Sequence, residues 1–337
     1  MSSKTNLFSI AEKTGYSVST VSRVLAGKAD KYRISQNAVE IIKEEARRCH
    51  YIPNLVAQSL RTRKSQTIGL VVPGIDNPFF ASLASSVISI LETQGYHTLL
   101  ADSREDEGEE ATALEMFRRR SVDGIIAVPV ASSPDLHEEL SRSIPLVLID
   151  RYFNSTFLPY VCTDNFDGSR MATQYLLTRG FRRILAVQGV PGSMPNRERV
   201  RGFYAALEGH PVECDIVGDA FSVENGYQQI IKAFEGQEKR YDAVFAFSTT
   251  ILLGVIDALR TLGFRAGKDV GVISFDNNSF LDFLDPAVTR VEQPLREIGE
   301  IAVTTLFSLI ESRNAGLPDP PPVRQLLRPT LIVRSSC

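Results

Sequence analysis

The sequence predicts an N-terminal all-α head with a hinge helix, followed by an α/β body of two doubly wound lobes. Two short helical patterns meet at a glycine close to the N-terminus. From Thr67 onward, short apolar runs alternate with longer helical patterns, as in parallel sheets with crossover helices. The two parts also differ in net charge. Residues 1–66 carry 12 Lys and Arg against 5 Asp and Glu, whereas residues 67–337 carry 25 Lys and Arg against 35 Asp and Glu.

The first helical pattern places Leu7, Ile10 and Ala11 on one face. Asn6 is a candidate N-cap, and Gly15 falls where a helix C-terminus favours a left-handed residue. The pattern therefore predicts a short helix with both ends defined by its sequence.

Ser17 is a candidate N-cap for a second helix, whose predicted apolar stripe is Val18, Val21, Val24 and Leu25. Two helices joined by a short turn containing glycine form the helix-turn-helix signature, although an ordinary helical bundle gives the same pattern. In the signature, the second helix enters the DNA major groove. Its hydroxyl side chains and Arg23 could donate to phosphates or base edges, and the basic head supports that interpretation.

Ser35 is a candidate N-cap for a third helix over about residues 36–49. Its expected packing face is Ala38, Ile41, Ile42 and Ala46. The preceding loop is basic and could contact phosphate through Lys28, Lys31 and Arg33.

Pro53 separates this helix from a short helical pattern over residues 55–61, for which Asn54 is a candidate N-cap. A helix of barely two turns is marginal in water, so it is expected to need a second subunit, DNA, or both. The alternative is a connecting helix that acts only as a spacer.

The body contains seven apolar runs that predict strands: TIGLVVP, YHTLLAD, VDGIIAVPV, IPLVLIDR, RRILAVQG, YDAVFAFS and DVGVISFDN. Seven exceed one small sheet, so two lobes are expected. Ligands of such folds bind beyond the carboxyl ends of the strands. Polar and aromatic residues that hydrogen-bond sugars or anions are concentrated there, among them Phe79, Phe80, Asp150, Arg151 and Asp276, with Arg197 and Arg199 near a helix start.

Other features restrict the class of protein. Cys49, Cys162, Cys214 and Cys337 have no paired spacing, which fits a reducing compartment better than a disulfide framework. With no apolar run of signal-peptide kind or of about 18 residues, we expect a cytoplasmic protein with no membrane contact. No metal-ligand spacing, cofactor motif or hydrolase motif occurs, so neither a metal, a cofactor nor catalysis is expected. The acidic run Glu105–Glu110 is most simply a solvated helix start.

Eight segments together resemble the LacI/GalR (lactose-repressor) family of bacterial transcription regulators over nearly the whole chain. They are IAEKTGYSVSTVSRVLAGK, YIPNLVAQSL, NPFF, VDGII, PLVLIDR, DNFDGSRMA, RERVRGFYAAL and GVISFDN. The resemblance implies a homodimeric repressor on a near-palindromic DNA operator, with a body like the type I periplasmic binding proteins. It implies DNA contacts at Ser17, Val18, Ser19, Thr20, Ser22, Arg23, Asn54, Ala57 and Leu60, with Leu60 as a wedge in the minor groove.

The same resemblance implies effector contacts at Phe79, Phe80, Asp150, Arg151, Arg197, Arg199, Ser248, Thr249, Asp276 and Gln293. Many family members have an Asn-Asp pair where this chain has Ser248 and Thr249. Hydroxyls at a helix N-terminus suit an anion better than a carboxylate would. The segments GKADKYRIS, FSTTILLGV and DNNSFLDFL are similar to the fructose-repressor branch, so a phosphosugar effector is the first hypothesis, with a free sugar as the alternative.

The expected domains are a head at residues 1–53, a hinge helix and linker at 54–66, and a body at 67–337. Lobe one is expected over 67–164 and 294–322, and lobe two over 165–293 and 323–337. Two alternatives are a cytoplasmic sugar-binding protein, which would lack the basic head, and a DNA-associated hydrolase with an unrecognised active site.

Overall fold

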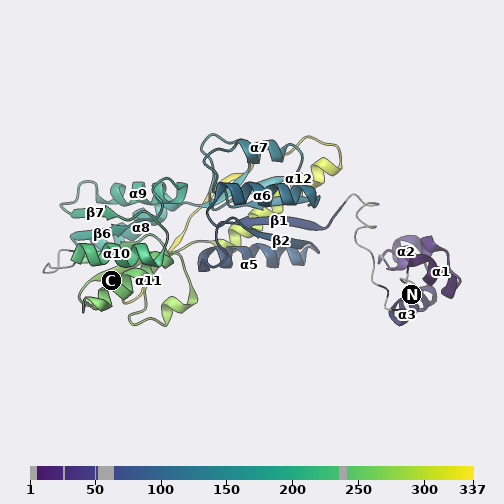
Figure 1. Ribbon diagram of the computed structural model, residues 1–337, viewed down its shortest axis with the longest axis horizontal. Coiled ribbons are helices and arrows are strands. Elements are labelled where there is room, and N and C mark those ends of the chain that lie inside the picture. The colour runs from purple at the N-terminus through teal and green to yellow at the C-terminus, as the bar shows by residue number, and fades with distance from the viewer. Residues whose placement is uncertain (1–5, 26, 50, 52–63, 235–240) are drawn as a thin grey trace. The chain divides into compact units, whose positions relative to one another are not determined.

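The computed structural model describes residues 6–25, 27–49, 51, 64–234 and 241–337, and divides the chain into two compact units, residues 1–65 and 66–337. The first unit, the head, contains α1 (Leu7–Thr14), α2 (Val18–Leu25), the 3₁₀ turn η1 (Asp30–Tyr32) and α3 (Gln36–Arg48). The second unit, the body, contains two six-stranded sheets. The expected helical head and the expected α/β body of two lobes are confirmed (Figure 1), whereas the expected hinge helix at residues 55–61 lies outside the described residues.

Local capping defines the helices of the head. The Asn6 side chain accepts a hydrogen bond from the Ser9 backbone N–H, and the Ser9 hydroxyl reciprocates, so the predicted N-cap is a full capping box. Gly15 ends α1 with φ 72°, a left-handed conformation that glycine adopts without strain. The Ser35 side chain caps α3 as expected.

The expected packing face of α3 is wrong at one position. Ile41 is 40% exposed, whereas Val39 is buried with Ala38, Ile42 and Ala46. The buried stripe is centred near Ile42, and Ile41 lies about 100° around the helix from it. Val39, one turn earlier, therefore takes the core position that Ile41 was expected to fill.

The sheet of lobe one has the order β11-β5-β4-β3-β1-β2, and all of its pairs are parallel. Its strands are β1 (Thr67–Val72), β2 (His97–Asp102), β3 (Gly124–Ala127), β4 (Leu146–Ile149), β5 (Tyr160–Thr163) and β11 (Arg324–Leu327). Helices α5 (Pro78–Thr93) and α12 (Leu295–Asn314) pack on one face, and α6 (Glu107–Arg119) and α7 (Asp135–Ser141) on the other.

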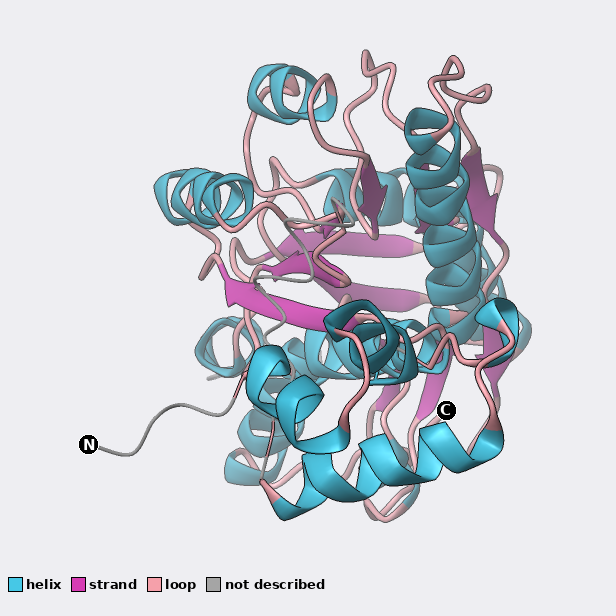
Figure 2. Ribbon diagram, turned by 90° about the vertical axis from the view of Figure 1, so that its right-hand side faces the viewer, coloured by secondary structure: helices cyan, strands magenta, loops and turns pink. Residues whose placement is uncertain are grey.

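The sheet of lobe two has the order β12-β10-β9-β8-β6-β7, parallel except for the edge pair of β12 with β10. Its strands are β6 (Arg183–Val187), β7 (Glu213–Val217), β8 (Ala243–Ala246), β9 (Gly271–Phe275), β10 (Thr289–Glu292) and β12 (Thr330–Ile332). Its helical elements are α8 (Asn165–Thr178), α9 (Met194–Leu207), α10 (Val223–Phe234), α11 (Thr249–Thr261) and the 3₁₀ turn η2 (Ser279–Asp282). Figure 2 shows the strands of the body between layers of helices.

The chain passes between the two sheets three times, from β5 to α8, from β10 to α12 and from β11 to β12. The expected start of the last lobe-two segment at residue 323 is wrong, because Arg324–Leu327 pairs with β5 in the sheet of lobe one. This edge strand is largely exposed and half polar, so it has no apolar run by which the sequence could reveal it.

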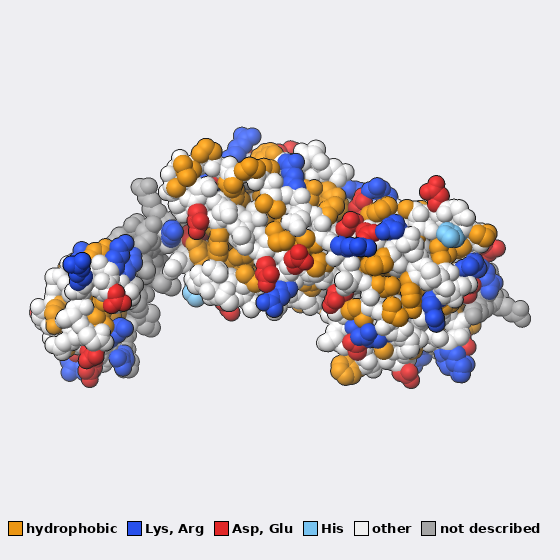
Figure 3. Space-filling model, turned by 180° about the vertical axis from the view of Figure 1, so that it is seen from behind, with side chains coloured by type: hydrophobic (Ala, Val, Ile, Leu, Met, Phe, Trp, Pro, Cys, Tyr) orange, Lys and Arg blue, Asp and Glu red, His pale blue; other side chains and the backbone are white. Residues whose placement is uncertain are grey.

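Among the described residues, no helix is long and apolar enough to span a lipid bilayer. On the face shown in Figure 3, the charged side chains of the head are more often Lys and Arg than Asp and Glu, while the body displays both signs of charge intermixed. The basic excess of the head is thus visible at its surface.

Close helix packing in lobe two generates a stability prediction. A Cβ at Gly254 of α11 would lie 2.0 Å from the Val223 carbonyl oxygen at the start of α10. Gly254→Ala is therefore expected to destabilise the body by about 1–3 kcal/mol, as overpacking does. Thermal unfolding checks this, with Gly192→Ala as the control because its Cβ would meet open space. Equal melting temperatures for the two variants would show that α10 and α11 separate without cost.

Candidate functional site

The N-terminus of α2 in the head presents a cluster of hydroxyl groups. The Ser17 Oγ accepts from the Thr20 backbone N–H at 3.1 Å, which caps the helix as the sequence predicts. The same oxygen lies 2.8 Å from the Ser19 Oγ and 2.9 Å from the Thr20 Oγ1. Because Ser17 and Ser19 are exposed, hydroxyl donors are available at the helix end that a helix-turn-helix directs to DNA.

Arg23 extends this surface from the last turn of α2. Its guanidinium lies 4.0 Å from the centre of the Tyr32 ring, a cation–π contact that holds an exposed side chain in place. Val18, Thr20 and Ser22 are half-buried, and Val18 packs against the head core. The predicted contacts Asn54, Ala57 and Leu60 lie outside the described residues.

In the body, two aspartates occupy equivalent places in the two lobes. Asp150 directly follows β4, and Asp276 directly follows β9. Both have left-handed backbones, with φ 63° and 74°, which a residue other than glycine adopts only at a cost of about 1 kcal/mol. Both side chains are almost fully buried, and Asp150 is close enough to Arg199 and Asp276 of the other lobe to be affected by their charges.

The side chain of Arg199, on α9, lies close to these aspartates. Its Nε donates to the Asn165 Oδ1 at 2.8 Å, and its Nη1 donates to the Phe247 carbonyl oxygen. The Nη2 lies 3.9 Å from the Asp276 Oδ1, and the guanidinium stacks 3.8 Å from the centre of the Phe275 ring. Three segments, at the start of α8, after β8 and at the end of β9, thus hold one buried cation.

Arg151 is the corresponding cation of lobe one. It donates to both carboxylate oxygens of Glu105, at 2.8 and 2.6 Å, and lies 3.8 Å from the Asp150 Oδ2. Its guanidinium is 5.6 Å from the centre of the Phe80 ring, which packs edge-on against Phe79. The predicted aromatics therefore form an apolar wall beside the charged groups.

Gln293 connects the second crossover to this cluster, because its Nε2 donates to the Asp276 Oδ1 at 2.6 Å. Ser248 and Thr249 begin α11 beside the same carboxylate, but their hydroxyls bond within the protein. The Ser248 Oγ accepts from the Ile251 backbone N–H at 3.2 Å, and the Thr249 Oγ1 donates to the Phe275 carbonyl oxygen at 3.4 Å.

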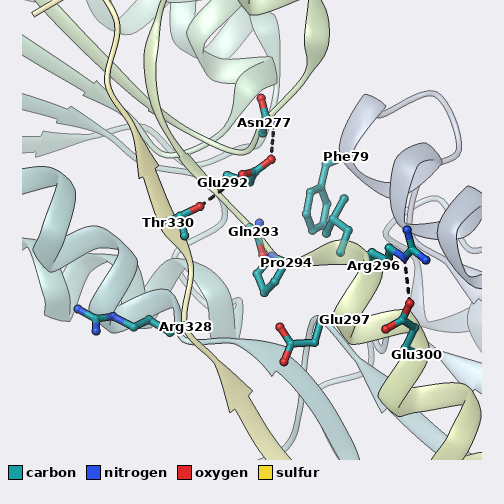
Figure 4. Close-up of a pocket in the computed structure, with 11 residues that line it drawn as sticks. Phe79, Asn277, Glu292, Gln293, Pro294, Arg296, Glu297, Glu300, Arg328 and Thr330 are labelled. Atoms are coloured by element: carbon teal, nitrogen blue, oxygen red, sulfur yellow. Dashed lines mark hydrogen bonds and ion pairs between the residues drawn. The ribbon is translucent and has the colours of Figure 1, made fainter.

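Two cavities between the lobes border this cluster, and together we call them the cleft. One, of about 760 Å³, is lined by Phe79 and Gln293 and by residues of the second and third crossovers. Figure 4 shows Gln293 and Pro294 on one crossover and Arg328 and Thr330 on the other. The second cavity, of about 530 Å³, is lined by loops of both lobes and includes Arg151 and Arg197.

Contacts or shared cavity walls connect most of the predicted effector residues. They connect Phe79, Phe80, Asp150, Arg151, Arg199, Thr249, Asp276 and Gln293, and Ser248 precedes Thr249 as the N-cap of α11. Arg197 shares the second cavity with Arg151, and its Nη1 donates to the Gly192 carbonyl oxygen at 2.7 Å.

Burial dominates the electrostatics of the cluster. It raises the pKa of Asp150 to about 6, despite the opposing effect of Arg151 and Arg199. Burial also raises the pKa of Asp276 and lowers the pKa of Arg199. Among the described residues, the buried Asp150 Oδ1 and Gln293 Oε1 accept no hydrogen bond from the protein. The cluster can therefore accept hydrogen bonds from a polar ligand.

Comparison with known proteins places the chain in a family. The ribose operon repressor of Halalkalibacterium halodurans is 32% identical over 309 residues, covering 92% of this chain and 91% of the relative. The chain belongs to the LacI family. A periplasmic-binding-protein-like domain model matches residues 173–337 of this LacI-family regulator.

Two solved structures agree with the assignment. The Cra transcriptional dual regulator of Pseudomonas putida, in complex with fructose 1-phosphate, is 27% identical and covers 80% of this chain and 98% of its own, with a TM-score of 0.71. The lac repressor is 22% identical and covers 99% of this chain and all of its own, with a TM-score of 0.86, which shows the shared fold. The resemblance identified from sequence motifs is confirmed.

Sequence reasoning missed two residues that support the LacI-family cleft. Asn165, which receives the Arg199 Nε hydrogen bond, follows a strand too short to be recognised, although the segment DNFDG contains it. Glu105 belongs to an acidic run that the sequence predicts to be solvated, yet it pairs with Arg151. In the described parts of the chain, no group of three or more His, Cys, Asp or Glu could hold a metal ion.

The raised pKa of Asp150 predicts a pH-dependent stability penalty. The folded protein holds this proton more tightly than the unfolded chain, so ionisation opposes folding. The penalty is absent below about pH 4 and complete above about pH 6, and reaches about 3 kcal/mol for a shift from 3.8 to about 6. Asp150→Asn should therefore raise the melting temperature relative to the native protein at pH 8, and by much less at pH 4.5.

Asp219→Asn, which removes an exposed carboxylate of lobe two, is the matched control and should show no such pH-dependent gain. If Asp150→Asn changes the melting temperature equally at both pH values, burial does not penalise ionisation of the Asp150 carboxylate.

Proposed function

We propose that this LacI-family regulator is a homodimeric repressor that binds a near-palindromic DNA operator through two heads. A small neutral sugar binds in the cleft and changes operator affinity. The observation that carries the sugar proposal is the pair of buried aspartates, Asp150 and Asp276, close to Arg199. Beside them, the Asp150 Oδ1 and the Gln293 Oε1 are buried acceptors that receive no hydrogen bond from the described residues. Carboxylate and guanidinium groups bind the hydroxyls of a sugar, and Phe79 offers an apolar surface for its ring face.

The charges near the cluster favour a neutral sugar over a phosphosugar. The Arg151 Nη1 and Nη2 both donate to the Glu105 carboxylate. Arg199 donates to Asn165 and to a carbonyl oxygen, and it lies beside Asp276. The Ser248 and Thr249 hydroxyls at the start of α11 form hydrogen bonds within the protein. A phosphate placed here would meet two carboxylates, while both guanidiniums already face carboxylates and the Arg151 Nε is a donor without a hydrogen-bond partner among the described residues.

A phosphosugar is the second candidate, and Arg197 is the observation that favours it. This guanidinium lines the second cavity, its side chain is exposed, and it forms no ion pair with a carboxylate among the described residues. The Cra relative contains fructose 1-phosphate. In this arrangement the sugar would occupy the aspartate cluster and its phosphate would reach Arg197.

Sugar binding can alter operator affinity only if the sugar has different affinities for two arrangements of the lobes. The three crossovers allow one lobe to turn on the other, and the expected hinge helix, with Leu60 in the minor groove, would transmit the change to the head. The family resemblance allows a ligand either to lower or to raise operator affinity. We propose that the sugar lowers it and so releases the operator. No catalytic role is proposed.

A thermal-shift panel with operator titrations tests the effector. The probes are ribose, ribose 5-phosphate, fructose and fructose 1-phosphate, with ribose first because of the ribose operon relative. A native-state ligand raises the melting temperature in proportion to the logarithm of its concentration over Kd. Stabilisation by a free sugar supports the proposal, and stabilisation only by phosphosugars would overturn it in favour of Arg197.

Arg199→Ala should weaken binding of the stabilising sugar by about 10- to 100-fold, because a charged hydrogen bond contributes about 1.5–3 kcal/mol. Operator affinity without sugar should remain within a factor of two. Arg201→Ala, on the same helix with its guanidinium paired to Glu198, is the control and should leave both affinities unchanged. Unchanged sugar affinity in Arg199→Ala would refute the assignment of the cleft.

Ser19→Ala should lower operator affinity by about 1 kcal/mol and relax the base preference at one position of each half-site. Binding to a panel of single-base operator variants at one salt concentration checks this. Gln36→Ala, an exposed change on α3, is the control. An equal loss of affinity for every variant would instead make Ser19 a phosphate contact.

A further inference from the structure

The acidic run Glu105–Glu110 is not simply a solvated helix start. Glu110 has no exposed surface at all, although it lies in the first turn of α6 among exposed acids. A carboxylate is almost never fully buried unless other groups satisfy it, so its partners indicate what it does.

Those partners are backbone groups of the cleft wall. The Glu110 Oε2 accepts from the backbone N–H of Val130 at 3.1 Å and of Ala131 at 2.9 Å. The Glu107 Oε1 accepts from the backbone N–H of Ser132 at 2.7 Å. Three consecutive peptide groups of the segment after β3 are thus bound by carboxylates of α6, and all three residues line the 530 Å³ cavity.

His137 contacts the other oxygen of the Glu110 carboxylate. Its Nε2 lies 2.8 Å from the Glu110 Oε1, and both side chains are fully buried. The His137 Nδ1 is buried without a partner among the described residues, so the geometry suits a neutral ring with its proton on Nε2. The same ring lies 5.4 Å from that of Phe153, which also lines the cavity.

The shape of this wall therefore depends on a few side-chain contacts. Residues 130–132 have no regular secondary structure, so no ladder of backbone hydrogen bonds fixes them. The same acidic run also supplies Glu105 to Arg151, so one short segment holds both a cation and a wall of the cavity. Hydrogen bonds from backbone N–H groups to an ionised carboxylate are among the stronger kinds.

We propose that Glu110, assisted by Glu107 and His137, is a positioning residue that fixes the wall at residues 130–132 and thereby sets the size of sugar that the cleft accepts. This inference rests on the proposed function, because the selectivity concerns the sugar site.

The principal test is Glu110→Gln, with Glu109→Gln as the matched control. Glu109 lies one residue away, its side chain is half exposed, and among the described residues it pairs with Arg104. In Glu110→Gln the amide NH₂ faces His137, so the ring must move its proton to Nδ1, where no acceptor lies. We expect Kd for the best pentose to rise at least tenfold and the ratio of hexose to pentose Kd to fall at least threefold. Glu109→Gln should change neither value by more than twofold.

Two further variants separate positioning from a loss of folding. Adding His137→Gln to Glu110→Gln should recover part of the lost selectivity, because a glutamine oxygen can accept from the new amide. Glu107→Gln removes one exposed carboxylate and should shift the Kd ratio in the same direction by a smaller factor. If Glu110→Gln weakens all sugars by one common factor, the size-selection proposal is overturned.

Hydrogen exchange separates this inference from the proposed function. The amides of residues 130–132 should be protected in the native protein and in Glu109→Gln, and should exchange at least tenfold faster in Glu110→Gln. Nitrogen-15 spectra of the native protein should show His137 as a neutral ring protonated on Nε2. If no sugar binds the native protein, the proposed function fails, and the exchange result still decides whether Glu110 holds the wall. Equal protection in Glu110→Gln would overturn it.

Discussion

The arrangement of the cleft depends on one buried, charged side chain, that of Arg199. Arg199 is almost fully buried, so its guanidinium must be satisfied by acceptors that do not move. A carbonyl oxygen after β8 and Asp276 after β9 lie together because these neighbouring parallel strands end at one edge of the sheet, and Asn165 at the start of α8 adds a third acceptor. The fold of lobe two thus provides acceptors from three chain segments around one cation.

Asp150 and Asp276 extend this arrangement across the space between the lobes. Each has a left-handed backbone and each resists ionisation because of burial. Such groups reduce the stability of the folded chain, and their retention makes sense where a ligand later satisfies them. The chemistry of the site and its cost in stability have the same physical origin.

Much of this architecture is predictable from local sequence, and the failures have physical causes. The caps at Asn6, Ser17 and Ser35 and the left-handed Gly15 were predicted because these interactions span only a few residues. All seven long apolar runs are strands. Five further strands, β5, β7, β10, β11 and β12, escaped prediction because they are short or partly polar, and without β11 the lobe boundary was misplaced.

The cleft was predictable as a set of residue types at strand ends, but not as a network. Sequence places Asp276 and Arg199 in the same lobe, yet only the fold reveals Asn165 as a partner of Arg199. Glu110 shows the limit most clearly, because a run of acids is ordinarily solvated and nothing local marks the one member that faces inward. The effector residues and DNA contacts as a set remain predictions until binding is measured.

The third crossover consists only of Arg328 and Pro329, between the end of β11 and the start of β12. Two residues reach at most about 7 Å, and proline removes one backbone torsion from them. The Arg328 Nε also lies 3.1 Å from the Asp167 Oδ2, which ties this link to α8. The link acts as a pivot of nearly fixed length, so the two lobes can change their angle but cannot be drawn apart at this edge. The sugar proposed for the cleft would accordingly act by changing the angle between the lobes.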